Sequence, residues 1–388
     1  MPAIFAATAA RGFFASGCYV HATPGVISVT DAFGRGILSA EAANAKETLM
    51  RWKNRPEGSN WGDFGPDDEL GRLNLLTPDR VLQGVAEVHE GRSFCLSLPL
   101  DYPGGNALNR LRHPPRRFTS GRGDKLNYNF ALNRINPTFT DVVSDDAVLL
   151  FTQYSTQWDA LSHVGALFDA DGDGEAEPLY YNGWRAGEDI QGPSGHEDAL
   201  EGVCANRLGI EKMAETAVSG RAVMIDLEKH CGHERVLVDY ARLQQIIKLD
   251  GVVIEPGDMV CLYTGFADVV LGMHKNPDAH TLENSCAVLD GRDPLLLQWI
   301  TDSGLSVLIA DNYAVEAYPA REGEGCCAAL PLHEHCLFKL GIHLGELWYL
   351  SELASYLRAN GRSRFMLTAP PLRLPGAVGS PLTPVALV

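Results

Sequence analysis

The residues whose types and spacing could do chemistry gather most densely between 151 and 163, where the chain reads FTQYSTQWDALSH. Within this run, Gln153, Gln157, Asp159 and His163 stand at relative positions 0, 4, 6 and 10. Aspartate and histidine are ordinary metal ligands and glutamine offers a neutral carbonyl oxygen, so the set suits an oxygen-tolerant ion such as zinc or manganese. The alternative is a group of polar side chains that hydrogen-bond around a loop. The spacing leaves both interpretations open.

The elements that carry this run decide whether its side chains can converge. On one continuous helix the four residues would spread over more than one face. We expect instead a strand at 147–152 that runs into a turn and then a helix. In the extended part, Gln157 and Asp159 would share one side, and Asp159 and His163 would lie one helical turn apart. A strand end that feeds a helix is also where α/β folds bind ligands.

The apolar pattern of the rest of the chain predicts strands that alternate with helices. Strands are expected at 93–100, 147–152, 222–227, 259–264 and 306–310, and helices at 77–90, 239–248, 294–302 and 345–360. Such alternation predicts an α/β fold. Residues 101–145 read as irregular, and a stretch of this length is usually functional or mobile. We expect a poorly ordered N-terminal extension over 1–45 and a single catalytic domain over 46–388.

Composition narrows the classes of partner. Lys plus Arg number 32 against 49 Asp plus Glu, a formal net charge of −17, which argues against binding of nucleic acid or anionic membranes. No apolar run approaches the roughly 20 residues that cross a bilayer. The nine cysteines are odd in number and scattered, which indicates a reducing, cytoplasmic compartment. Residues 1–30 could still be a cleaved targeting segment, although a disordered extension is favoured.

The run at 153–163 resembles the signature of the putative cyclase family, His-x-Gly-Thr-His-x-Asp-x-x-x-His, which includes bacterial kynurenine formamidases and isatin hydrolases. Thr156, Asp159 and His163 match it, whereas Gln153 and Gln157 replace its two leading histidines. The glutamine form resembles a longer branch that includes zinc-dependent trans-dienelactone hydrolase. Further segments support the resemblance in order along roughly residues 58–385: 61–62, 68–77, 220–226, 257–265, 310–316, 332–346 and 375–381.

The resemblance implies a swivelling β/β/α fold in which helices surround a barrel-like mixed sheet, and a homodimer or homotetramer. It also implies a downstream pair of ligands, which alignment on Gly341-Ile342 places at Glu334 and Glu346. His333 or His335 could reach the site as a ligand or as support with a small register change. The favoured arrangement is one divalent ion per chain, zinc first and manganese second. Its ligands would be Gln153, Gln157, Asp159 and Glu334. A vestigial site without metal is the alternative.

The function that follows is hydrolysis, in which metal-activated water attacks the carbonyl of a small lactone, cyclic amide or N-formyl aromatic amide. His163 would shuttle the proton or support Asp159, and Glu346 would be a second acid or base. Trp61, Trp158 and Arg116 are candidates for holding the substrate, although tryptophans are often core residues and surface arginines often form weak ion pairs. The alternative is a catalytically inactive protein that binds a small molecule on the same scaffold.

Overall fold

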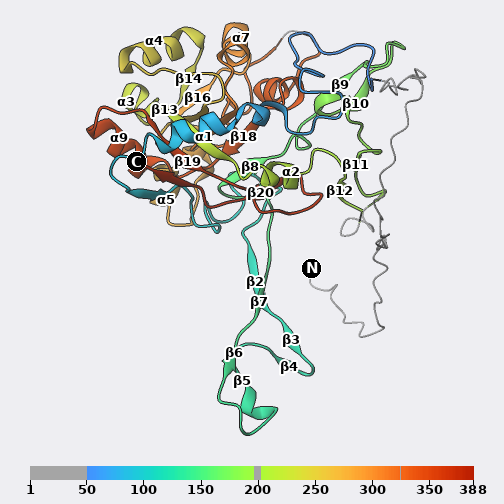
Figure 1. Cartoon of the computed structure of the whole chain (residues 1–388), viewed down its shortest axis with the longest axis vertical. Helices are drawn as coiled ribbons and strands as arrows, with labels where there is room; N and C mark the ends of the chain where they lie inside the picture. Colours follow the sequence, from blue (N-terminus) through green and yellow to red (C-terminus); the bar gives the residue numbers. More distant parts are fainter. Residues whose placement is uncertain (1–49, 196–201, 324) are drawn as a thin grey trace, which may run out of the picture. The chain divides into compact units, whose positions relative to one another are not determined.

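The computed structural model describes residues 50–195, 202–323 and 325–388, all of which belong to one compact unit, Thr48–Val388. The extension predicted over 1–45 lies outside the described residues. A nine-stranded sheet forms the centre of this unit (Figure 1). Its strands, in spatial order, are β1 (Ser93–Cys95), β21 (Val385–Leu387), β19 (Arg364–Thr368), β13 (Ser219–Asp226), β15 (Met259–Tyr263), β17 (Val307–Ala310), β18 (His343–Glu346), β8 (Gln157–Asp159) and β20 (Gly379–Pro381).

The sheet is mixed. Strands β13, β15, β17 and β18 run parallel, while the outer strands on both sides pair antiparallel. The α-helices are α1 (Pro78–Val85), α2 (Ile210–Glu215), α3 (Glu228–Cys231), α4 (Tyr240–Asp250), α5 (Phe266–Gly272), α6 (Ala279–Glu283), α7 (Pro294–Ser303), α8 (Pro331–His333) and α9 (Ser351–Ala359). The prediction of an α/β fold built on a barrel-like mixed sheet with surrounding helices is confirmed.

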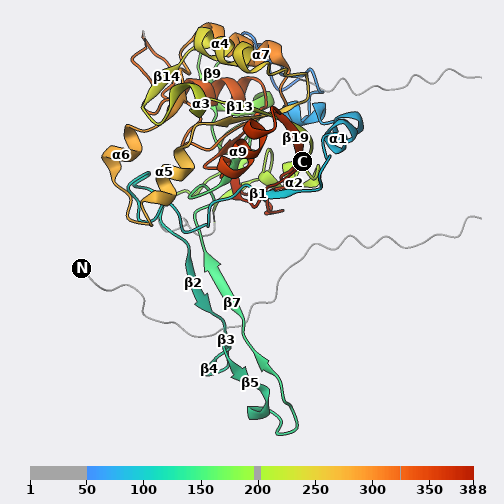
Figure 2. The same cartoon turned by 90° about the vertical axis from the view of Figure 1, so that its left-hand side faces the viewer.

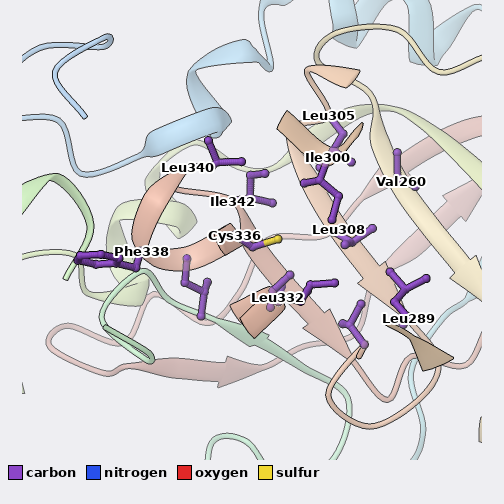
Figure 3. Close-up of a cluster of buried hydrophobic side chains, with 14 of the residues drawn as sticks. Val260, Leu289, Ile300, Leu305, Leu308, Leu332, Cys336, Phe338, Leu340 and Ile342 are labelled. Carbon is purple, nitrogen blue, oxygen red and sulfur yellow. The ribbon is translucent and has the colours of Figure 1, made fainter. Parts of the chain in front are cut away.

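The central parallel strands are apolar on both faces because helices cover both. In β13, Val223 and Ile225 pack into one cluster with side chains of α4 and α7, whereas Ala222 and Met224 point to the opposite cluster with side chains of α9. This is the two-residue alternation of a strand. The first cluster extends to the segment after α8. Figure 3 shows Cys336 of this segment, with neighbouring apolar side chains, close to Leu308 of β17.

Local signals fixed the helix ends well in two cases. Helix α4 begins after Asp239, whose side chain accepts the backbone N–H of Arg242, and it ends at the left-handed Gly251. Helix α7 begins at Pro294 behind the capping Asp293. The helix expected at 345–360 is wrong in its first part, because His343–Glu346 is strand β18, hydrogen-bonded between β17 and β8. Helix α9 begins only at Ser351.

Residues 116–149 form a hairpin arm that leaves the sheet in both views (Figures 1 and 2). Its strands are β2 (Arg116–Thr119), β3 (Gly121–Arg122), β4 (Lys125–Leu126), β5 (Phe130–Ala131), β6 (Val142–Val143) and β7 (Asp146–Leu149), with a 3-10 turn, η2 (Leu132–Arg134). The prediction that residues 101–145 are irregular is therefore wrong from residue 116 onward, where the arm begins. The strand predicted at 147–152 corresponds to β7, which pairs with β2 in the arm and does not feed a helix.

The remaining elements are short. Within the described residues, three further strand pairs lie outside both the main sheet and the arm: β9 (Ala166–Phe168) with β10 (Glu177–Leu179), β11 (Ile190–Gln191) with β12 (Cys204–Ala205), and β14 (Val236–Val238) with β16 (Ala287–Leu289). The 3-10 turns η1 (Gly71–Leu75) and η3 (Tyr181–Gly183) and the π-helix η5 (Glu334–Lys339) complete the set. None of the helices in the described part of the chain is long and apolar enough to cross a membrane. The eight cysteines there are free thiols, and the cytoplasmic location stays a prediction.

Candidate functional site

Two neighbouring strands bring the first polar side chains together. Strand β8 pairs antiparallel with β18, so that Gln157 lies opposite Glu346 and Asp159 lies opposite Leu344. Because strand side chains alternate, Gln157 and Asp159 project from the same face, as predicted. The two residues lie within a strand, however, and no helix follows them as the sequence had suggested.

Trp158, between them, points to the other face. Its ring packs edge-on against Trp348 at a centroid distance of 5.1 Å, and its indole N–H donates to the backbone oxygen of Ala369 at 2.8 Å. The side chain is fully buried. The structure therefore corrects the prediction that Trp158 holds the substrate: the tryptophan is a core residue.

Asp159, His333 and Glu346 form the centre of the candidate site. Each offers one ligand atom, and these atoms all lie within 4.8 Å of one another. Gln157 joins them, because its Nε2 donates to Glu346 Oε2 at 3.2 Å and to Asp159 Oδ1 at 3.4 Å. All four side chains are buried. The cluster draws its members from β8 and from two later segments, α8 and β18, which are far from β8 in sequence.

Glu316, which the sequence analysis did not single out, orients His333. Its Oε1 lies 2.8 Å from His333 Nδ1, and its carboxylate also accepts the backbone N–H groups of Leu332 and His333, each at 3.0 Å. With Nδ1 held in this way, Nε2 of the ring faces Glu346 Oε1 at 3.2 Å. A carboxylate that fixes one ring nitrogen of a histidine leaves the other directed at the site, which is how metal-binding histidines are usually held.

The cluster contains more carboxyl groups than basic groups, and this imbalance shifts the pKa values of its members. Burial, and then the Glu346 carboxylate, raise the pKa of Asp159 to about 8. Burial would lower the pKa of His333, but its contacts with Glu316 and Glu346 outweigh that cost and raise it to about 10. The pKa of Glu346 is lowered, because His333 and Arg112 together outweigh the opposing effect of burial. Without a further cation, the cluster retains protons at neutral pH.

His163 reaches the cluster from a turn after β8. Its Nε2 lies 3.8 Å from Asp159 Oδ1, and its Nδ1 lies 3.5 Å from Nε2 of Gln153, a long contact. Desolvation of the ring, followed by the nearby Arg112 charge, lowers its pKa to about 4, so that it is neutral at physiological pH. The predicted spatial pairing of Asp159 with His163 is present, although the segment that separates them is a turn and not a helix.

An arginine beside the site is Arg112, and not the predicted Arg116. The Arg112 guanidinium donates to the backbone oxygen of Gln153 at 2.7 Å, and its charge lowers the pKa of Asp159, His163 and Glu346. Arg116 lies in β2 of the arm and is exposed. Nothing in the arginine-rich run 110–117 distinguishes these residues, because the choice depends on where the arm leaves the sheet.

The positions of Glu334 and His335 require a correction. Glu334 is half-buried and lines a different cavity, beside Cys326 and Cys327. His335 Nε2 contacts Thr301 Oγ1 at 2.9 Å, away from the cluster, and burial lowers its pKa to about 4. Successive helical residues point in directions about 100° apart, so only one of this run can face the site. That residue is His333.

Trp61 is also corrected. It is 1% exposed and belongs to the core, where its indole N–H donates to the backbone oxygen of Phe338 at 2.7 Å. Its ring packs edge-on against the rings of Trp52 and Phe338. Burial on this scale leaves no surface for a substrate, so the predicted role in substrate binding is withdrawn.

Two oxygen atoms indicate that the cluster suits a cation. Gln157 Oε1 and Asp159 Oδ2 are buried, and neither has a hydrogen-bond partner among the described residues. Buried polar atoms are rarely left unpaired, since each costs about 1–3 kcal/mol. Together with Glu346 and the directed Nε2 of His333, they form an oxygen-rich set with one imidazole, which fits zinc or manganese. The residues present can therefore hold a metal ion.

Comparisons with known proteins agree with the fold. The sequence model described as putative cyclase matches residues 96–317. A crystal structure described as a novel cyclase is 30% identical, with a TM-score of 0.65, over 85% of this chain and 97% of that chain. Isatin hydrolase A from Ralstonia solanacearum is 17% identical, with a TM-score of 0.49, over 80% of this chain and 98% of that one. No curated protein matches the chain.

Proposed function

Because the chain belongs to the putative cyclase family, we propose that it is a metal-dependent hydrolase of a small carbonyl compound. The substrate would be a lactone, a cyclic amide or an N-formyl aromatic amide of the arylformamidase type. The observation that carries the proposal is the buried cluster of Asp159, His333 and Glu346, in which Asp159 Oδ2 has no hydrogen-bond partner among the described residues. Perturbed pKa values in a site of this kind are typical of catalytic centres.

One divalent ion, zinc first and manganese second, would be held by Asp159, His333, Glu346 and the amide oxygen of Gln157. This set differs from the one predicted from the sequence, with His333 and Glu346 in place of Gln153 and Glu334. Gln153 contacts His163 and so stands beside the set as a positioning residue. Such an ion, when bound, lowers the pKa of water and polarises a substrate carbonyl.

The remaining steps belong to the side chains themselves. His163 Nδ1 faces the N–H donor of Gln153, so Nδ1 is the basic nitrogen and the hydrogen of the neutral ring lies on Nε2, which faces Asp159. The 3.5 Å contact of Nδ1 with Gln153 is weak enough for water or substrate to replace. A neutral His163 can then take a proton from the attacking water at Nδ1 and return it to the leaving group. Glu316 holds His333 in register throughout.

The test is a hydrolysis screen of the full-length chain with lactones, cyclic amides and formanilides, each with added zinc or manganese. We expect turnover of one of these classes, dependent on the metal and abolished in Asp159→Asn. Two results would contradict the proposal: turnover that Asp159→Asn leaves unchanged, or no turnover of any class by a folded protein. The second result, combined with tight binding of a screened compound, would favour the inactive small-molecule-binding protein instead.

We also propose that the chain functions as a homodimer or homotetramer in which the hairpin arm contacts a second copy. A two-stranded ribbon is at best marginally stable alone, and exposed apolar patches mark protein contacts. Large apolar side chains of the arm are exposed: Phe118, Leu126, Ile135, Val142, Val148 and Leu149. Light scattering should show an oligomer that Leu126→Asp with Ile135→Asp dissociates. Leu249→Asp, at an exposed leucine of α4, is the matched control, and equal masses for all variants would refute the contact.

A further inference from the structure

A cavity of about 140 Å³ lies beside the candidate site and is lined largely by apolar and aromatic side chains. Phe266, Leu282, Tyr313 and Tyr318 form much of its wall, and the rings of Tyr313 and Tyr318 meet edge-on at 6.2 Å. An apolar protein cavity of about 150 Å³ holds benzene. The cavity is therefore the right size for a single ring.

The cavity adjoins the candidate site through shared walls. Leu108 and Tyr313 line both this cavity and a smaller one, whose wall includes Arg112 and Gln153. Burial raises the pKa of Tyr313, and the nearby Glu346 carboxylate raises it further. The backbone makes the same connection, because the oxygen of Asn312 accepts the N–H of Leu347, the residue after Glu346. A molecule that fills the cavity would therefore reach toward the cluster.

Arg235 lines this cavity without a counter-charge. Within the described residues its guanidinium has no hydrogen bond and no carboxylate within 4.0 Å, and burial lowers its pKa. Glu283 also lines the cavity, but it is exposed and does not pair with the arginine. Other partly buried arginines have partners of one kind or another: Arg221 pairs with Asp258 at 2.8 Å, and Arg72 donates to the backbone oxygen of Ile300 at 2.8 Å. A desolvated cation without an anion is costly, and a ligand carboxylate would offset that cost.

Asn312 adds a second polar atom that lacks a partner. The side chain is 2% exposed, and its Nδ2 donates to the backbone oxygen of Ala287 at 2.9 Å. Its Oδ1 is buried with no partner among residues that the structure describes. This oxygen is closed to solvent, so Asn312 belongs to the wall of the cavity and its Oδ1 makes no contact with a molecule inside.

We propose that this cavity binds a small single-ring acid, whose carboxylate pairs with Arg235. If the single-ring acid is the substrate or the product of the reaction, the inference rests on the proposed function, and the hydrolysed compound or its product is an anion with one ring. As a statement about binding, it stands independently of catalysis. Neutral lactones and neutral formanilides would then be poorer ligands than their carboxylated counterparts.

The experiment measures binding of benzoate and of its neutral isostere, benzamide, to the full-length chain by calorimetry. Benzoate should bind more tightly than benzamide to the wild-type protein. Arg235→Met should raise the Kd of benzoate at least about tenfold, as expected for the loss of a charge-assisted hydrogen bond, and should leave benzamide nearly unchanged. Arg235→Lys should fall between the two, because it keeps the charge and loses the planar fork.

The matched control is Arg373→Met, which removes an exposed arginine that pairs with Glu215 outside the cavity and should leave benzoate binding unchanged. Equal benzoate affinity in the wild-type, Arg235→Met and Arg373→Met proteins would overturn the inference. Benzoate binding is measured in Asp159→Asn as well. Loss of hydrolysis there with benzoate binding intact separates the two proposals, so each can fail without the other.

Discussion

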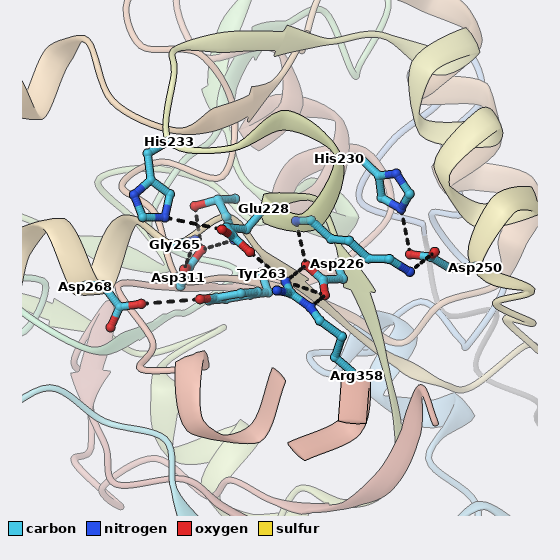
Figure 4. Close-up of polar contacts among 12 residues, drawn as sticks. Asp226, Glu228, His230, His233, Asp250, Tyr263, Gly265, Asp268, Asp311 and Arg358 are labelled. Atoms are coloured by element: carbon cyan, nitrogen blue, oxygen red, sulfur yellow. Dashed lines mark hydrogen bonds and ion pairs between the residues drawn. The ribbon is translucent and has the colours of Figure 1, made fainter. Parts of the chain in front are cut away.

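Two polar regions of the molecule satisfy their charges in opposite ways. In the first, which we call the Arg358 network, the Arg358 guanidinium binds Asp226 through two hydrogen bonds of 2.8 and 2.9 Å (Figure 4). A third hydrogen bond, of 2.6 Å, reaches Glu228. Arg358 is 39% exposed, so water shares in the solvation of the group. Each charge of this network has both an opposite charge and solvent.

In the candidate site, the carboxylates of Asp159, Glu316 and Glu346 surround a single histidine, His333, and all four side chains are buried. Solvent cannot compensate, and Asp159 Oδ2 has no partner within the described chain. Like charges that are buried away from water destabilise a fold unless a ligand of opposite charge binds among them. The contrast separates a network that stabilises the structure from one that is prepared for a ligand.

The strongest test of this contrast is Asp159→Asn. Removal of this carboxylate should lower kcat/KM by about a thousandfold or more, because a metal ligand and the partner of His163 are lost together. The stability of the metal-free protein should change little at neutral pH, since Asp159, with its pKa of about 8, already keeps its proton there. Steady-state kinetics and thermal unfolding measure the two effects. Asp226→Asn is the control from the Arg358 network, and equal losses of activity in both variants would remove the distinction.

Removal of metal is the next largest expected effect. Chelation should abolish activity, and zinc or manganese at a hundred times its Kd should restore it and add about 2.7 kcal/mol of stability. His333 and Asp159 keep their protons up to pKa values of about 10 and about 8, so an incoming cation must displace protons. Metal affinity should therefore fall as the pH falls, by at least about tenfold per unit between about pH 6 and 8.

Titration calorimetry in buffers of different ionisation enthalpy counts the protons released. A metal affinity that does not change with pH would show that the cluster is not the binding site. Asp159→Asn should release fewer protons per ion than the wild-type protein, because one of the titrating groups is gone.

The sequence predicted those parts of the site that depend on local geometry. Strand alternation placed Gln157 and Asp159 on one face, and the four-residue spacing paired Asp159 with His163. It could not choose between His333 and Glu334, because a shift of one residue turns the side chain by about 100°. Nor could it find Glu316, whose link to His333 exists only once the segment that follows β17 packs against α8.

The fold shows the same division between local and long-range information. The predicted starts of α4 and α7 lie within a residue of the observed ones, and the aspartate that caps each helix acts on that helix alone. The sequence wrongly predicts helix for residues 345 and 346, which end strand β18, because the pairing of this strand with β8 involves residues almost two hundred positions away. The barrel-like sheet was predicted from the family resemblance, because the hydrophobic pattern alone does not give the order of the strands.

A smaller effect is expected from Glu316→Gln, a substitution in the candidate site that removes a charge without removing a metal ligand. Glutamine keeps the shape but weakens the contact with His333 Nδ1, so metal affinity and kcat/KM should fall about ten- to a hundredfold. The pKa of His333 should also fall, because one of the two carboxylates that raise it is gone. NMR titration of the metal-free protein measures that pKa. A merely structural role would leave the pKa unchanged and lower only the thermal stability.

The smallest effect is expected from Arg358→Met in the Arg358 network. Partly exposed ion pairs contribute about 0.2–1 kcal/mol, and the apolar part of the methionine retains the packing of the arginine stem. The free energy of unfolding should therefore drop by no more than about 1 kcal/mol, and less at high salt, which screens exposed charges. Metal content and kcat/KM should match those of the wild-type protein. Loss of metal in Arg358→Met would mean that pairing and exposure do not separate structural charges from functional ones, and the assignment of Asp159, His333 and Glu346 would lose its physical basis.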